Sequence, residues 1–116
     1  LLNTILTVER GKSKSHANIG WQRFVKIVLY ELLNDPAPKV FMLWGNEAQT
    51  LFQEVETRVP VNPHACLYAK HPAADLYAAD QFGDTAPNYP ATFAGCGHFS
   101  KANEFLLKNK RKHIRW

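Results

Sequence analysis

Three stretches of the sequence combine polar groups with backbone features that suit molecular recognition. Asn3 lies in the apolar run LLNTILTV, and its carboxamide carries both a hydrogen-bond donor and an acceptor. Gly45 and Asn46 follow the run VFMLW, and backbone amides at a helix start suit an anion. His71 and Pro72 follow the run HACLYAK, and an imidazole can exchange a proton near neutral pH. Taken singly, each also has a plainer explanation as a turn, cap or core residue.

Strands are expected to carry these residues. The apolar runs at 1–8, 40–45 and 64–70 are typical of strands, and the second is continuously apolar, as in a strand covered on both faces. Helical patterns separate the runs, which implies βαβ crossovers and a mainly parallel sheet. In such sheets the ligand site lies beyond the carboxyl ends of the strands. The three stretches are therefore expected near one rim.

Three helices are expected between and after the strands. The i, i+3, i+4 spacing of apolar residues predicts an amphipathic helix over 21–34, with seven residues on its apolar face, and NDPAPK ends it. A second helix is expected to start with Asn46 as its cap, and a third over 98–109 with Ser100 as its cap. The apolar face of the first helix comprises Trp21, Phe24, Val25, Val28, Leu29, Leu32 and Leu33.

Composition indicates an ordinary globular domain. The chain has 116 residues, 46% of them hydrophobic and 21% charged, which is enough for one core. It has no apolar run long enough for a membrane span and no secretory signal, and its two cysteines favour a reducing compartment. We expect a bacterial cytoplasm, or a nucleus if the source is eukaryotic. The formal charge of +4, concentrated in KNKRKHIRW and ERGKSKSH, favours polyanionic partners only weakly.

Read in order, five segments resemble the C-terminal half of family 1 uracil-DNA glycosylases. They are LLNTILTV, SHANIGWQRF, VFMLWGNEAQ, KHP and GCGHFSKANEFLLKNKRKHIRW, and they run from the first residue to the last. The resemblance implies a three-layer α/β/α fold with a mainly parallel sheet, incomplete here with three strands and three helices. It also implies that residues 1–116 are the C-terminal part of one glycosylase-like domain whose N-terminal part is absent.

The resemblance also implies roles for the polar residues. Asn3 matches the asparagine that reads uracil, because an amide can pair with O4 and N3–H together, whereas cytosine presents the opposite pattern. His71 matches the catalytic histidine, which acts as a neutral donor to the charge developing on uracil O2. Gly45 and Asn46 match a Gly-Ser pair whose backbone amides hold a DNA phosphate. Asn in place of Ser is a departure that leaves backbone contacts possible.

The sequence departs from the family after the His-Pro pair. The family has Ser-Pro-Leu-Ser there, with serines that bind phosphates and a leucine that wedges into the DNA helix. This chain continues HPAADLYAADQFGDTAPNYPATFAGC, without both serines. Pro72 is kept as a DNA contact, Leu76 is the expected wedge, and Tyr77 is the alternative. Asp75 and Asp80 would face a polyanion unfavourably.

A second departure lies upstream of the matched region. The family has a Gly-Gln-Asp-Pro-Tyr-His segment whose aspartate positions the attacking water, together with an aromatic floor for uracil and a proline-rich phosphate loop. None of these is matched in the chain. A central strand of the family sheet would also lie outside it. We therefore expect a chain that is part of a longer protein and that is inactive alone.

The expected partners follow from the resemblance. They are uracil-containing single- and double-stranded DNA, a proteinaceous glycosylase inhibitor, and the absent N-terminal half, with no membrane partner and a monomeric state. No cofactor or metal is expected. A zinc site made of His64, Cys66, Cys96 and His98 can be drawn from the spacing, but core cysteines explain the pattern at least as well.

The predicted activity is hydrolysis of the N-glycosidic bond of uracil in DNA, the first step of base-excision repair. The alternative is a non-catalytic nucleic-acid-binding module of the same ancestry, which the unmatched aspartate segment favours. A flavodoxin-like nucleotide or interaction domain is a third hypothesis. It is disfavoured because no glycine-rich phosphate loop follows any expected strand.

Overall fold

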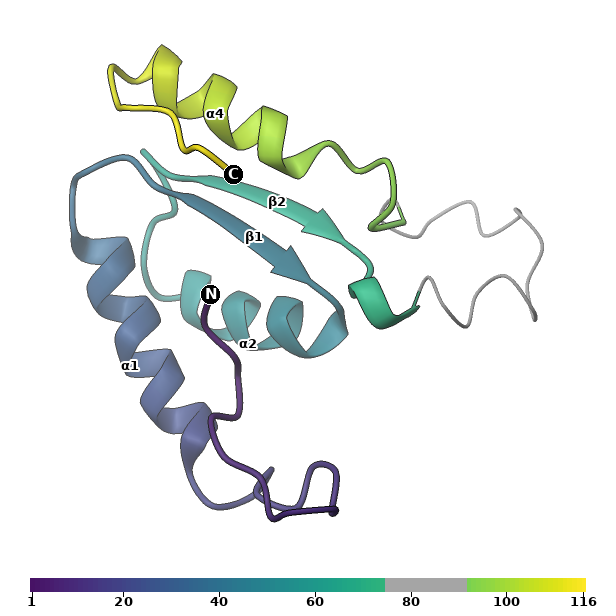
Figure 1. Ribbon diagram of the computed structural model, residues 1–116. Helices are drawn as coiled ribbons and strands as arrows, with labels where there is room; N and C mark the ends of the chain where they lie inside the picture. Colours follow the sequence, from purple (N-terminus) through teal and green to yellow (C-terminus); the bar gives the residue numbers. More distant parts are fainter. Residues whose placement is uncertain (75–91) are drawn as a thin grey trace.

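The computed structural model describes residues 1–74 and 92–116 (Figure 1). Its elements alternate between helix and strand, which confirms the predicted α/β class, and residues 72–74 form a further helical turn. Within the described residues no helix has the length and apolar character needed to cross a membrane. In chain order the elements are α1 (Trp21–Asn34), β1 (Val40–Trp44), α2 (Asn46–Glu56), β2 (Ala65–Ala69) and α4 (His98–Lys108).

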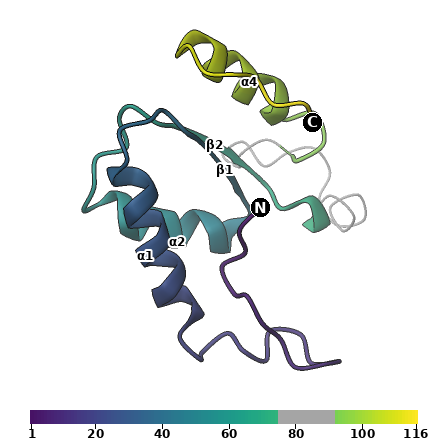
Figure 2. The ribbon, with the colours of Figure 1, turned by 60° about the vertical axis from the view of Figure 1, so that its left-hand side comes forward.

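The two strands pair in parallel, as the crossover pattern predicts. The register runs from Val40 opposite Ala65 to Trp44 opposite Ala69. α1 and α2 lie on one side of the strands, and α4 lies on the opposite side (Figures 1 and 2). The result is a three-layer arrangement around a short parallel sheet, so the carboxyl ends of both strands meet at one edge.

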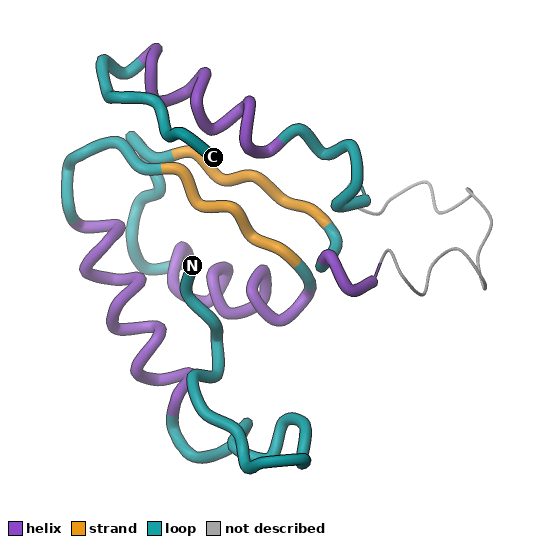
Figure 3. The backbone as a smooth tube through the Cα atoms, viewed as in Figure 1, coloured by secondary structure: helices purple, strands orange, loops and turns teal. Residues whose placement is uncertain are grey.

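The expected first strand is absent from the structure. Residues 1–8 form an irregular segment with a bend at residues 4 and 5, drawn as loop at the N-terminal end in Figure 3. Leu1, Leu2 and Val8 are exposed. A strand is stable only when its backbone groups find a ladder partner, and no described segment pairs with this one. The described chain thus contains two of the three expected strands.

Both predicted helix caps are displaced by a glycine. Gly45, not Asn46, precedes the first turn of α2, and Asn46 is the first helical residue. Gly97 precedes α4 with φ 65°, so Ser100 is the third residue of the helix instead of its cap. Neither cap position forms a side-chain hydrogen bond to the helix. Glycine serves at these entries because it adopts positive φ without the penalty of a Cβ.

The main core lies between the α1–α2 pair and β1. Phe52 is fully buried, and its ring lies 5.0 Å from that of Phe41 on β1. The predicted apolar face of α1 is buried only in part, because Phe24 is 50% exposed. The Phe24 ring contacts the Trp21 ring edge-on. The buried members of the core are Val25, Leu29, Leu33, Leu43, Leu51, Phe52, Val55 and Val59.

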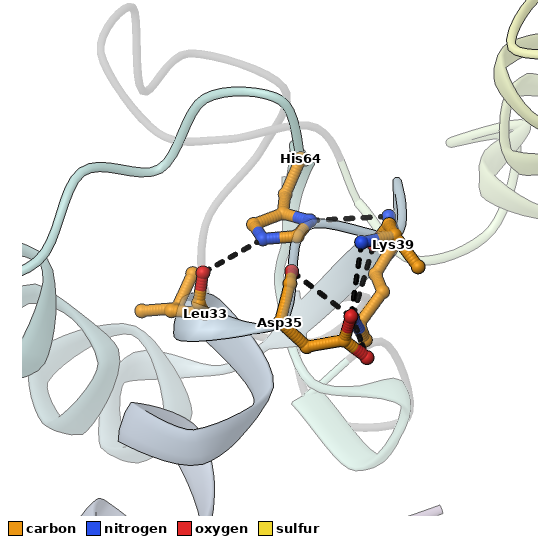
Figure 4. Close-up of polar contacts among 5 residues, drawn as sticks. Leu33, Asp35, Lys39 and His64 are labelled. Carbon is orange, nitrogen blue, oxygen red and sulfur yellow. Dashed lines mark hydrogen bonds and ion pairs between the residues drawn. The ribbon is translucent and has the colours of Figure 1, made fainter.

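A buried histidine connects three elements at the start of the strands (Figure 4). His64 Nδ1 accepts a hydrogen bond from the Lys39 backbone N–H at 3.2 Å, and its Nε2 lies 3.0 Å from the Leu33 carbonyl oxygen. Since Nδ1 accepts, the ring proton is on Nε2 and donates to that carbonyl. Beside it, Lys39 pairs with Asp35 at 2.8 Å, and the hydrogen bond from Lys39 lowers the pKa of the Asp35 carboxyl.

Candidate functional site

A cavity of about 400 Å³ opens at the carboxyl end of β1. It brings together Asn3 and His71, which are 68 positions apart in the sequence, and Pro72 beside them. Its size lies within the range of small-ligand sites and exceeds that of a single pyrimidine base. Its position is the rim that the parallel topology predicts. The lining residues are Leu1, Leu2, Asn3, Thr4, Ile5, Met42, Trp44, Glu47, Ala48, His71 and Pro72.

Asn3 reaches the cavity from the irregular N-terminal segment. Its side chain is exposed and forms no hydrogen bond with another described residue, so both its donor and its acceptor are free. The segment is anchored further along by Thr7, whose Oγ1 accepts from Trp21 Nε1 at 2.6 Å and lies 2.8 Å from His16 Nδ1. The anchor connects the segment to the start of α1.

His71 follows β2 and has a defined tautomer. Its Nδ1 accepts a hydrogen bond from the Ala73 backbone N–H at 3.0 Å, and its carbonyl accepts from the Ala74 N–H at 2.8 Å. An accepting Nδ1 carries no proton, so the neutral ring bears its proton on Nε2. Among the described residues Nε2 has no hydrogen-bond partner. The exposed ring therefore offers one N–H donor at the cavity.

Gly45 packs closely against His71. It has φ 87° and ψ 163°, a conformation that is essentially restricted to glycine. A Cβ at this position would lie 3.0 Å from His71 Cβ, tighter than most real Cβ contacts, so His71 would have to move slightly. The Gly45 N–H donates to the Ala69 carbonyl at 2.9 Å and is therefore occupied within the fold. The expected phosphate contact stays a prediction, and the amides available for it are those of the first turn of α2, beginning at Asn46.

Gln49 is a positioning residue that the sequence analysis did not identify. Its side-chain Nε2 lies 3.2 Å from the Leu43 carbonyl and 3.0 Å from the Ala69 carbonyl, so one amide joins the ends of both strands. It lies four residues after Gly45, within the first turns of α2, and no sequence pattern indicates its contacts with the strand ends. This bond fixes the strand ends from which Gly45 and His71 extend.

An acidic residue at the cavity is paired with a distant lysine. Glu47 lies in the first turn of α2 and lines the cavity, and its Oε1 accepts from Lys14 Nζ at 2.9 Å. The helix N-terminus favours this carboxylate, and the lysine offsets its charge. Neither residue was singled out from the sequence alone. Leu76 and Tyr77, the predicted DNA wedge, lie outside the described residues, as do Asp75 and Asp80.

The four residues of the conceivable zinc site serve structural roles where their contacts are defined. His98 Nδ1 accepts from Trp44 Nε1 at 3.0 Å, and His64 is engaged at both ring nitrogens. Burial lowers the pKa of His98, with the charge of Lys101 acting in the same direction, and burial raises the pKa of the Cys66 thiol. In residues 1–74 and 92–116 no three His, Cys, Asp or Glu side chains are grouped to hold a metal ion.

The chain is similar to uracil-DNA glycosylases from a virus and from bacteria. The chain is 40% identical over 116 residues to a uracil-DNA glycosylase of Saimiriine herpesvirus 2, covering all of this chain and 42% of the relative. It is 38% identical over 117 residues to that of Bordetella pertussis, again covering 42% of it, and 40% identical over 116 residues to one from Campylobacter jejuni, covering 43%. No family model matches the chain.

The matches span the whole chain but less than half the length of each curated relative. This coverage is consistent with the predicted correspondence to a C-terminal part, and it confirms the resemblance that the motifs indicated. The chain is thus a homologue of the uracil-DNA glycosylases and corresponds to part of their length.

Proposed function

We propose that this chain takes part in removing uracil from DNA, as the portion of a glycosylase that holds the flipped base and stabilises the leaving group. The observation that carries the proposal is the shared cavity of about 400 Å³, in which a free carboxamide at Asn3 and an N–H donor at His71 are both present. Homology to the uracil-DNA glycosylases supports the choice of uracil as the base.

The reaction breaks the bond between C1′ of the deoxyribose and N1 of uracil. The electron pair leaves with the base, a water oxygen bonds to C1′ and loses a proton, and free uracil and an abasic site result. Negative charge develops on uracil O2, and His71 Nε2–H is available to donate to it. Because Nδ1 accepts from Ala73, the ring is oriented in advance and needs no reorganisation.

Asn3 supplies recognition in this proposal. A fixed amide pairs with uracil O4 and N3–H, while cytosine would leave polar groups unpaired at a cost of about 1–3 kcal/mol each. The free donor and acceptor of the exposed Asn3 support this role. Backbone amides at the start of α2, with Pro72, are proposed to contact the DNA backbone, and Leu76 or Tyr77 to fill the vacated stack.

Catalysis in this proposal needs residues beyond this chain. We propose that a segment equivalent to the remaining length of the relatives supplies the water-positioning aspartate and the missing strand. Coverage of only 42% of the relatives supports this requirement. The proposal further includes a monomeric enzyme that acts on single- and double-stranded DNA in a cytoplasm or nucleus. A proteinaceous glycosylase inhibitor is a further proposed partner.

The test is a reconstituted glycosylase. The unmatched part of a relative is joined to this chain, and uracil release is followed on labelled single- and double-stranded DNA. We expect release from both, with His71→Ala lowering turnover by roughly 10²–10³-fold while binding changes little. Asn3→Asp should erode discrimination between uracil and cytosine. Arg58→Ala, at an exposed position outside the cavity lining, is the control.

The second candidate is a nucleic-acid-binding module without catalysis. It is favoured by the exposed cations of residues 101–116, which can contact a polyanion without any catalytic group. The same experiment separates the two functions. A module would bind DNA with an affinity that falls with salt and is indifferent to uracil, and the reconstituted protein would form no abasic product.

A further inference from the structure

The segment after α4 folds back along the helix and forms what we call the basic hook, residues 109–116. The hook runs alongside α4 in both ribbon views (Figures 1 and 2). Asn103 on α4 forms two hydrogen bonds with Ile114, from the Ile114 N–H to Oδ1 at 2.7 Å and from Nδ2 to the Ile114 carbonyl at 2.9 Å. One side chain thus holds the hook against the helix.

Further contacts fix both ends of the hook. The Arg111 N–H donates to the Leu106 carbonyl at 2.8 Å, next to Lys110, which adopts a positive φ of 58°. At the other end, Trp116 Nε1 donates to the Phe99 carbonyl at 3.2 Å, and the two rings lie 4.8 Å apart. The backbone of the hook is therefore held in place before any ligand binds.

The hook and α4 concentrate the charge of the molecule. Residues 101–116 contain six cations and one acid, Glu104, so this region holds more than the whole net charge of +4 and the rest of the chain is close to neutral. All six cations are exposed, and none forms an ion pair with a described residue. The cations are Lys101, Lys108, Lys110, Arg111, Lys112 and Arg115.

The interaction of cations with the helix dipole explains only some of these six basic residues. Basic residues near a helix C-terminus offset its dipole, but the effect is confined to the last turn, where Lys108 lies. Lys112 and Arg115 lie beyond that range on a segment of fixed backbone. Like charges held together repel one another, which destabilises the fold unless an anion is bound. A hollow of about 490 Å³ lies among these residues, lined by Leu106, Lys110, Arg111, Lys112 and Ile114.

We propose that the basic hook binds the phosphodiester backbone of nucleic acid, without regard to uracil, at a surface separate from the cavity. Several cations along a fixed extended segment suit a row of phosphates, and binding releases the counterions that these phosphates hold. Lys110, Arg111 and Lys112 follow the C-terminal end of α4, which lies toward the beginning of the strands, whereas the cavity lies at the carboxyl end of β1 (Figure 1). Binding at the hook requires neither a uracil base nor a catalysed reaction, so this inference goes beyond the proposed function.

A lipid surface is the less suitable polyanion. Membrane-surface segments present an amphipathic helix whose aromatic residues are free to insert. Here Trp116 is held through its indole N–H and its ring to Phe99, and the hook itself is not helical. Nucleic acid requires only the cations, which remain fully accessible.

The test measures binding of the full chain to a labelled uracil-free oligonucleotide by fluorescence anisotropy, at several salt concentrations. Lys110→Gln, Arg111→Gln and Lys112→Gln are combined in one variant. We expect its affinity to fall by roughly 10–100-fold and its slope of log affinity against log salt to shrink by about 2–3. A control variant with equal charge combines Arg10→Gln, Arg23→Gln and Arg58→Gln, all at exposed positions, and should weaken binding far less.

Three outcomes would contradict the proposal. Equal losses in the two triple variants would mean that net charge alone attracts the oligonucleotide. Tighter, hook-dependent binding of vesicles with anionic headgroups would identify a lipid ligand instead. Asn103→Ala, which preserves charge but releases the hook, should reduce affinity about threefold, and an unchanged affinity would contradict a prearranged site. The oligonucleotide contains no uracil for the cavity to hold, so the hook and the excision activity can fail independently.

Discussion

The two ends of β2 carry histidines with opposite environments. His64 immediately precedes the strand, is 8% exposed, and uses both ring nitrogens in hydrogen bonds within the fold. His71 lies just after the strand, is exposed, and uses only Nδ1. In both rings Nδ1 accepts a backbone N–H and the neutral proton is on Nε2. The difference is what Nε2–H meets: a carbonyl of the same chain in one case, and an open cavity in the other.

This contrast shows how one side-chain chemistry serves two purposes. A backbone donor at Nδ1 selects the tautomer in either place, so the tautomer does not identify a functional histidine. What differs is the partner of Nε2–H, because a buried N–H without a partner would be costly, whereas an exposed one can bond to water until a ligand arrives. His64 therefore stabilises the fold, whereas His71 keeps an N–H free for the role proposed above.

The largest effect is expected for alanine in place of His64, with alanine in place of His71 as the comparison. His64→Ala leaves the Leu33 carbonyl and the Lys39 N–H without partners and opens a cavity, so we expect a loss of about 2–4 kcal/mol in the free energy of unfolding. His71→Ala should change it by less than about 0.5 kcal/mol. Urea denaturation of the full chain measures both. Similar losses in the two variants would remove the distinction between the histidines.

A second prediction concerns the close approach of Gly45 to His71. Gly45→Ala places a methyl group 3.0 Å from His71 Cβ and forces a side chain into a glycine conformation. We expect a loss of about 1–3 kcal/mol in the free energy of unfolding and a displacement of the imidazole. NMR shifts of the His71 ring report the displacement. Gly11→Ala, at a positive φ with open space around it, is the matched control for backbone strain alone.

Local patterns predicted most of the regular elements. The helix over 21–34 is observed with the predicted bounds, and β1 and β2 lie within the two later apolar runs. These elements follow from periodicity, which a single segment carries. Residues 1–8 show the limit of that approach: an apolar, β-branched run predicts that a strand can form, but pairing depends on a second segment that the pattern does not contain.

The candidate site was predictable at the level of its residues and not of its geometry. Asn3 and His71 were placed at one rim by the parallel topology and by family motifs, and they do line one cavity. The contact between Gly45 and His71, and the Gln49 amide between two carbonyls, depend on the relative positions of separate elements. Propensity and spacing say nothing of such distances, so they emerged only from the structure.

A third and smaller effect is expected at Gln49. Gln49→Ala removes the shared donor of the Leu43 and Ala69 carbonyls, although Ala69 keeps its bond from the Gly45 N–H. We expect a loss of about 1–2 kcal/mol in the free energy of unfolding. Amide hydrogen exchange should quicken at the ends of β1 and β2 while the centre of α1 is unaffected. Uniform quickening across the chain would show that Gln49 stabilises the whole fold instead of the strand ends.

The smallest expected effect tests a third histidine, which resembles His64 in its burial. Burial lowers the pKa of His98, so the unfolded chain takes up this proton more readily than the folded chain does. Its contribution to stability is present above the ordinary pKa of about 6.5 and is lost progressively as the pH falls below that value.

His98→Asn should therefore flatten the dependence of the free energy of unfolding on pH between about 5 and 7, even though it also weakens the bond to Trp44. Gln22→Asn, at an exposed uncharged position of α1, should leave the dependence as it is. Urea titrations at stepped pH give the slopes. If the His98 variant kept the slope of the unsubstituted chain, the interior histidines could not be treated as one class, and the contrast with His71 would rest on His64 alone.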